Sequence, residues 1–99
     1  MHSRFWQLLD AASDIQDFCD REGITVGFFG SFADGTCDGN SDLDILIIDG
    51  FDPPRRFRVA SQIEDIAFSR GVLPDIAFRD LSPHLKKTCR SFHAIREEL

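Results

Sequence analysis

Between Gly30 and Ile48 the chain reads Gly-Ser-Phe-Ala-Asp-Gly-Thr-Cys-Asp-Gly-Asn-Ser-Asp-Leu-Asp-Ile-Leu-Ile-Ile. An apolar segment ends at Gly30 and Ser31, a loop rich in Gly, Asp and Asn follows, and a second apolar segment opens with Asp42 and Asp44. Side chains two residues apart on a strand point to the same face of a sheet. The sequence therefore predicts two carboxylates on one face beside a glycine turn, an arrangement that suits a divalent metal.

A third acidic residue, Asp75, interrupts the later apolar segment Val72–Phe78 as Asp44 interrupts the earlier one. Acidic residues are disfavoured inside strands, so something should compensate for each of them. One interpretation is a shared functional site. The alternative is an edge strand in which Asp75 faces water, and Pro74 next to it favours that alternative because proline is confined to edges and strand starts.

Gly30 and Ser31 are followed by ten residues and then by Asp-Leu-Asp at 42–44. This spacing resembles the signature of the DNA polymerase beta nucleotidyltransferase superfamily, in particular its minimal nucleotidyltransferases. The resemblance implies a third acid about one helix and one strand later, where Asp75 stands. It covers nearly the whole chain. Domains of this kind are often encoded beside a HEPN-domain protein, so the resemblance also implies a HEPN partner.

The resemblance assigns roles to these residues. It implies that Asp42, Asp44 and Asp75 bind Mg²⁺ and are catalytic, with Asp75 also orienting or deprotonating the acceptor hydroxyl. Gly30 and Ser31 would hold the triphosphate. The implied reaction is magnesium-dependent transfer of a nucleotide, AMP from ATP, to a hydroxyl of a protein or other acceptor, in the antitoxin-like member of a two-gene toxin–antitoxin system. Two divalent ions about 3.5–4 Å apart stabilise both ends of such an in-line displacement.

Asp34 departs from the family pattern. Many minimal nucleotidyltransferases read Gly-Ser-x-Ala-Arg-Gly, whereas this chain has Asp34 in place of the arginine. This charge reversal favours a second hypothesis, a catalytically weak or inactive binding module that neutralises its partner by direct contact. The complete set of three acids favours the enzyme. A third hypothesis, a fragment of a nucleic-acid-directed polymerase, lacks room for a template-binding domain.

Length and composition narrow the class of protein. A chain of 99 residues predicts one domain, 1–99, because it can bury only one core. The formal charge of −6 makes broad nucleic-acid binding unlikely as a function, because backbone contacts need clustered cations. Cys19, Cys37 and Cys89 are an odd number without paired spacing, which predicts free thiols. Without an apolar run long enough for a bilayer or a signal peptide, we expect a cytoplasmic protein, and a homodimer stays open.

Hydrophobic periodicity predicts an α/β (α+β) fold in the order α-β-(short α)-β-α-β-α. We expect a small mixed three-stranded sheet with helices mainly on one face, as in the nucleotidyltransferase fold. The expected segments are a helix over 4–21, a strand over 24–29, a short helix from 31, a strand from 42 to 48, a helix ending at 71, a strand over 72–78 and a single helix from 82 to 99.

Arg55, Arg56 and Arg58 fall in the first turns of the helix that ends at Gly71. Positive charge there opposes the helix dipole, so these arginines are candidates for contact with a partner or for the acceptor side of the site. The alternative is a solvated charge run. The three histidines are assigned as surface or packing residues.

Overall fold

The computed structural model describes residues 3–99, and one of the assigned histidines, His2, lies outside this range. The elements follow the predicted order. They are α1 (Ser3–Glu22), β1 (Val26–Phe29), α2 (Gly30–Asp34), β2 (Leu43–Ile47), α3 (Pro53–Ser69), β3 (Pro74–Phe78), the 3-10 helix η1 (Pro83–Lys87) and α4 (Phe92–Glu97).

The three strands form one sheet in the order β1-β2-β3. β1 runs antiparallel to β2, whereas β2 and β3 are parallel, which confirms the predicted mixed sheet. Parallel neighbours need a crossover connection, and α3 supplies it between β2 and β3. The N-terminal ends of β2 and β3 therefore meet at the same end of the sheet.

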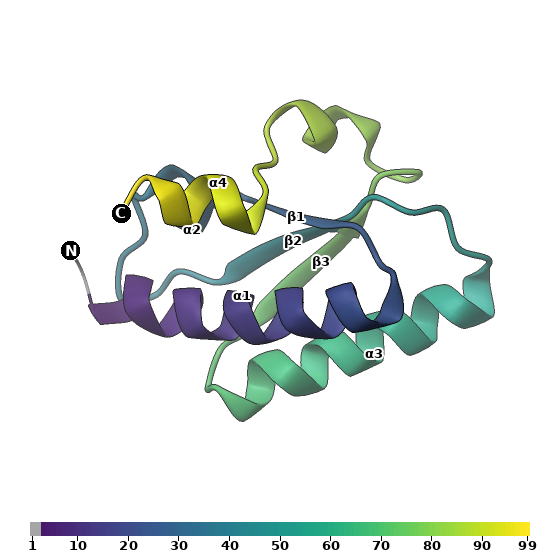
Figure 1. Ribbon diagram of the computed structural model, residues 1–99, viewed down its shortest axis with the longest axis horizontal. Coiled ribbons are helices and arrows are strands. Elements are labelled where there is room, and N and C mark those ends of the chain that lie inside the picture. Colours follow the sequence, from purple (N-terminus) through teal and green to yellow (C-terminus); the bar gives the residue numbers. More distant parts are fainter. Residues whose placement is uncertain (1–2) are drawn as a thin grey trace.

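One face of the sheet carries the core. α1 and α3 lie side by side along this face (Figure 1), and every second strand residue points into the space beneath them. The buried strand residues on this face are Val26, Phe28, Leu43, Ile45 and Ile47. Phe92 and Ile95 of α4 join the same core, so the helices lie mainly on one face, as predicted.

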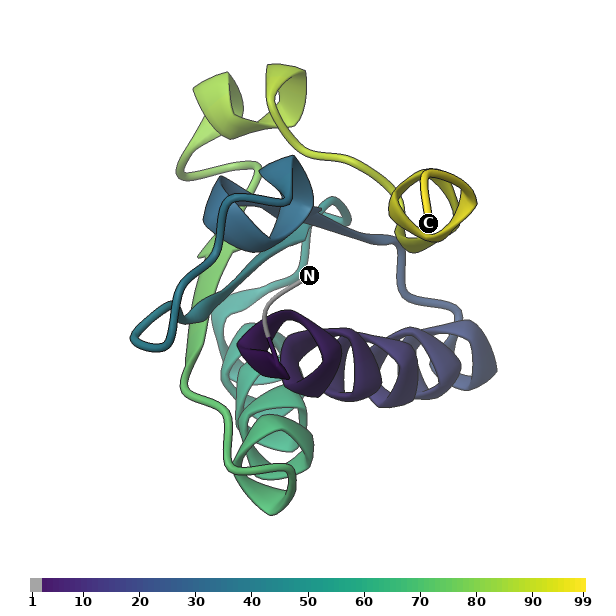
Figure 2. The same cartoon turned by 90° about the vertical axis from the view of Figure 1, so that its left-hand side faces the viewer.

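The opposite face is partly covered by the segment around η1, which projects from the body of the protein in Figures 1 and 2. Gly27 lies on this face, and a β-carbon there would be 3.1 Å from Cys89 Sγ. Cys89 therefore packs closely on the backbone of β1. Within residues 3–99, no helix combines the length and the apolar character that crossing a membrane requires.

The prediction of one helix from Ser82 to Leu99 is wrong. Phe28 and Arg90 exchange two backbone hydrogen bonds, of 2.8 and 2.7 Å, and this bridge holds residue 90 in an extended conformation between η1 and α4. A new helix then starts at Ser91, whose Oγ accepts a hydrogen bond from Ala94 N at 3.1 Å. Ser82, where the predicted helix begins, makes no side-chain capping bond. The spacing of the apolar residues fits one helix, but the backbone pairing of Arg90 with β1 interrupts it.

Candidate active site

Asp44 and Asp75 lie directly opposite each other in the parallel register of β2 and β3. Residues in register on neighbouring parallel strands project to the same face, so the two carboxylates are adjacent there. Asp44 is half-buried and Asp75 is exposed. β3 is an edge strand that begins at Pro74, as expected if Asp75 simply faced water. Asp75 nevertheless lies beside Asp44.

Gly30 lies next to Asp44 on the side away from Asp75. It follows β1 directly, and Phe29 at the end of β1 is the antiparallel partner of Asp44. Gly30 has φ +73°, and a β-carbon there would be 2.0 Å from Asp44 Oδ2. Only glycine therefore allows both the left-handed backbone and the approach of the carboxylate.

The electrostatics show that the three predicted acids influence one another. Burial, followed by the charges of Asp75 and Asp42 and a hydrogen bond with Asp75, raises the pKa of Asp44 from an ordinary value of 3.8 to about 6. Negative charge thus gathers where β2 and β3 begin, and a cation placed there would relieve it.

Asp42 is held by an ordered turn. Asp38 Oδ1 accepts a hydrogen bond from Asn40 N at 2.9 Å, and Ser41 Oγ accepts one from Asp38 N at 2.8 Å. Arg4 Nε donates to Ser41 O at 3.1 Å, which ties the turn to α1. Asp42 itself is exposed at the end of this loop, where its side chain is open to solvent.

The donor set fits a divalent cation in its chemistry, since all three side chains are carboxylates and Mg²⁺ prefers oxygen ligands. Asp44 and Asp75 already lie side by side. Within residues 3–99, however, no group of three His, Cys, Asp or Glu side chains converges on a point where it could hold one ion. A site shared by all three acids requires the exposed side chain of Asp42 to turn toward the other two.

Ser31 lies in the first turn of α2, next to Gly30. The early N–H groups of a helix have no intrahelical partner and can bind phosphate oxygens. Phe32 and Ala33 are buried and anchor α2 in the core, while Gly35 ends it with φ 74°. The helix that follows Gly30 is therefore anchored in the core, and Gly30 itself lies beside Asp44.

Arg55, Arg56 and Arg58 are not brought to the acids. They lie on α3 beyond the far ends of β2 and β3, where Arg56 packs over the ring of Phe78. Arg56 Nη2 also donates to Phe51 O at 3.1 Å and lies 3.6 Å from Asp80 Oδ2, so Arg56 fixes the connection around α3.

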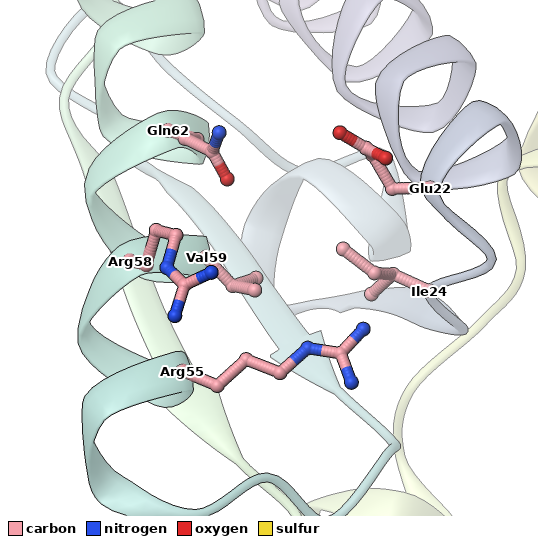
Figure 3. A pocket seen from close by; sticks show the side chains of 6 residues that line it. All are labelled: Glu22, Ile24, Arg55, Arg58, Val59 and Gln62. Carbon is pink, nitrogen blue, oxygen red and sulfur yellow. The ribbon is translucent and has the colours of Figure 1, made fainter.

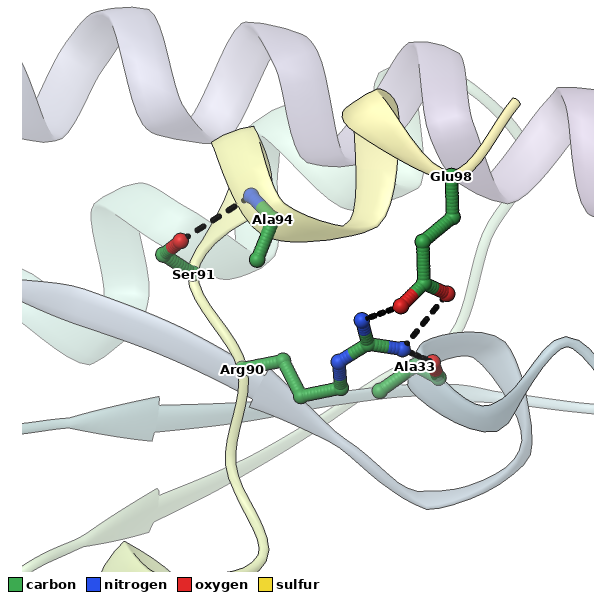
Figure 4. A network of polar contacts seen from close by, with 5 residues as sticks. All are labelled: Ala33, Arg90, Ser91, Ala94 and Glu98. Carbon is green, nitrogen blue, oxygen red and sulfur yellow. Dashed lines mark hydrogen bonds and ion pairs between the residues drawn. The ribbon is translucent and has the colours of Figure 1, made fainter.

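Sequence reasoning missed Arg90 as a residue that positions the site. Arg90 Nη1 donates to Ala33 O at 3.0 Å, and its guanidinium forms an ion pair with Glu98 (Figure 4). A hydrogen bond with Glu98, then the charges of Glu98 and Asp34, raise the pKa of Arg90. Arg90 thus links α2, which carries Ser31, to α4. No sequence pattern points to this role, because the spacing of apolar residues around Arg90 is typical of a helix.

Comparison with known families agrees with this geometry. A family model described as "Nucleotidyltransferase domain" matches residues 13–96, a span that contains Gly30, Ser31 and the three acids. The comparisons with curated proteins and with solved structures returned no match. The mixed three-stranded sheet is also consistent with a nucleotidyltransferase fold. Because the match extends over most of the sequence, this chain belongs to the nucleotidyltransferase domain family.

Proposed function

We propose that this chain is a magnesium-dependent nucleotidyltransferase that transfers AMP from ATP to a hydroxyl group of a protein or other acceptor. The observation that carries the proposal is the adjacency of Asp44 and Asp75 on one face of the sheet, with Gly30 in contact with Asp44 and with Asp42 just before the start of β2. Nucleotidyl transfer uses carboxylates that hold divalent ions, and these residues supply carboxylates.

Each residue has a task that its surroundings support. Gly30 and Ser31 would hold the triphosphate, with the backbone N–H groups of the turn and the Ser31 hydroxyl as donors to its oxygens. Asp75 is exposed and would orient the acceptor hydroxyl or take its proton. Asp44 packs against Gly30, and this contact holds its carboxylate in place.

Asp42, Asp44 and Asp75 would hold Mg²⁺. When bound, divalent ions supply positive charge to the attacking and leaving oxygens of an in-line displacement. The three carboxylates by themselves would repel a nucleoside triphosphate, so nucleotide binding should depend on the cation. Burial, followed by the charges of Asp75 and Asp42, raises the pKa of Asp44 to about 6, so the site already disfavours further negative charge.

The chain would act within a two-gene toxin–antitoxin system, with a HEPN-domain protein as its partner. The resemblance to minimal nucleotidyltransferases supports this part of the proposal.

The second candidate is a binding module that neutralises its partner by contact and turns over weakly or not at all. Asp34 favours it. It is exposed, it stands at the end of the helix that begins with Gly30, and it adds negative charge where the family pattern has a cation.

Titration of ATP with and without Mg²⁺ tests the proposal, together with transfer of radiolabelled AMP to the co-purified partner. We expect Mg²⁺-dependent binding that Asp42→Asn with Asp44→Asn abolishes and that Asp65→Asn, an exposed acid on α3, leaves intact. Unchanged binding by the double variant would reject the metal assignment. Binding by the wild-type chain without any transfer would instead favour the second candidate.

A further inference from the structure

A cavity of ≈190 Å³ lies between the C-terminal end of α1 and the first half of α3. Its lining residues are Glu22, Ile24, Arg55, Arg58, Val59 and Gln62. Positions three and four apart on a helix share a face, so the α3 residues form one wall. Figure 3 shows Arg55, Arg58 and Gln62 reaching from that wall toward the cavity, with Glu22 and Ile24 opposite.

Neither guanidinium group in this cavity forms an ion pair with another of the residues that the structure describes. The ion pairs found within residues 3–99 are Arg56–Asp80, Arg70–Asp14 and Arg90–Glu98, and none includes Arg55 or Arg58. Arg55 lies over the ring of Phe51, 4.5 Å from its centroid, which directs the guanidinium without cancelling its charge.

The placement of Arg55 and Arg58 is electrostatically unfavourable. Arg55 and Arg58 occupy the first turns of α3, where positive charge opposes the helix dipole. The chain carries a formal charge of −6, and yet these two cations stand together without a carboxylate within ion-pair distance in the described residues. An anion in the cavity would relieve both features at once.

We propose that this cavity is a second anion site, which binds the phosphate group of a phosphate monoester. Guanidinium groups bind phosphate oxygens through paired hydrogen bonds, and the Gln62 amide adds a further donor. The cavity is smaller than the about 300–1,000 Å³ of sites for drug-sized ligands, so it takes the phosphate group while the rest of the ligand extends outward.

This site is separate from the acids. Asp44 and Ile47 are three residue steps apart on β2, about 10 Å at about 3.3 Å per residue, and α3 begins only beyond Ile47. A triphosphate held at Gly30 and Ser31 therefore lies at the other end of the sheet. The second site thus binds a different phosphate group from the one that would react.

Glu22 sharpens the test because it places a negative charge in the same cavity. Its carboxylate repels a bound dianion, so Glu22→Gln should tighten phosphate binding. Arg55→Gln with Arg58→Gln should weaken it. The charge-matched control is Lys86→Gln with Lys87→Gln, which also removes two exposed cations but from η1.

The experiment follows the backbone amide resonances of Ile24, Val59 and Gln62, which line the cavity and remain in every variant, by NMR while inorganic phosphate or AMP is added without divalent metal. We expect saturable binding of both, weaker by about tenfold or more in the Arg55→Gln, Arg58→Gln variant, tighter in Glu22→Gln and unchanged in the lysine control. Arg55→Lys with Arg58→Lys should be intermediate, since charge remains but the paired geometry is lost.

Three results would overturn the inference. They are the absence of saturable phosphate binding, equal weakening in the lysine control, and full affinity in the Arg55→Gln, Arg58→Gln variant with an unchanged melting temperature. Binding of inorganic phosphate without AMP would contradict a monoester ligand, whereas AMP bound as tightly as phosphate or more tightly supports it.

Discussion

The carboxylate of Asp44 lies against the α-carbon of Gly30, so close that a β-carbon at position 30 would be 2.0 Å from Asp44 Oδ2. The end of β1 and the start of β2 are thereby fixed to each other at the point where the chemistry would occur. The position of the acid and the absence of a side chain at position 30 depend on each other.

Gly30→Ala should therefore destabilise the protein more than glycine removal elsewhere. Gly23→Ala is the matched control, because Gly23 also has positive φ, +69°, but nothing lies within 4 Å of its added β-carbon. We expect about 1–2 kcal/mol from backbone strain in the control, and a larger loss together with loss of ATP binding for Gly30→Ala. Urea unfolding of both variants measures the difference, and equal losses would refute the close contact.

The raised pKa of Asp44 predicts a pH-dependent stability. The folded chain holds a proton on Asp44 up to about pH 6, whereas the unfolded chain releases it near 3.8. The contribution of Asp44 to folding therefore becomes less favourable as pH rises from about 4 to about 6, because the folded state binds more protons there. Asp44→Asn should remove this slope and melt at a higher temperature than the wild-type chain at pH 7.

Melting curves between pH 4 and 8 check that expectation, with Asp65→Asn as the control for loss of one acid. Mg²⁺ should raise the melting temperature of the wild-type chain at pH 7 and leave Asp44→Asn unaffected. A wild-type chain that melts higher than Asp44→Asn at neutral pH would show that the acids do not repel each other.

Asp34 should weaken ATP binding. Asp34 ends a five-residue helix that starts at Gly30, so at 1.5 Å per residue it stands about 6 Å along the axis, within the Debye length of about 8–10 Å at ordinary salt. We expect Asp34→Arg to tighten ATP binding and Asp34→Asn to produce part of that gain. Affinities measured at low and high salt decide, since the gain should shrink with salt.

We expect Arg90 to affect nucleotide binding by positioning α2, and not by contacting the reacting groups. Arg90→Lys keeps the charge but cannot bond Ala33 O and Glu98 together in the same planar geometry. We expect a small loss of stability and a raised KM for ATP with less change in kcat, because the turn at Ser31 loosens. Glu98→Gln is the control, since exposed ion pairs contribute little and the bond to Ala33 survives. A pure kcat effect would contradict a positioning role.

Much of the fold could be predicted because glycines bound the apolar segments. Gly23, Gly30 and Gly71 each take positive φ and mark the ends of helices and strands where the sequence placed them. The adjacency of Asp44 and Asp75 could be anticipated from the family pattern, but only the register of β2 and β3 fixes it.

The C-terminal region and the placement of the arginines could not be predicted, since both depend on contacts between distant residues. Local spacing in residues 82–99 fits a helix, and only the bridge from Phe28 to Arg90 interrupts it. Arg55, Arg56 and Arg58 look alike in sequence, yet Arg56 packs on Phe78 while the other two line a cavity. The three arginines differ in burial, which depends on contacts with distant residues and not on local sequence.

The parallel pairing of Asp44 with Asp75 also determines when the site can exist. The two acids are 31 residues apart in sequence (75 minus 44), and α3 must form and dock before β3 can align with β2. Closing such a long loop is slow compared with forming local helices and hairpins. We predict that during synthesis and refolding the acid pair assembles after the local helices, because β3 must pair with β2 across α3. A chain in which β3 has not yet paired with β2 would lack the acid pair.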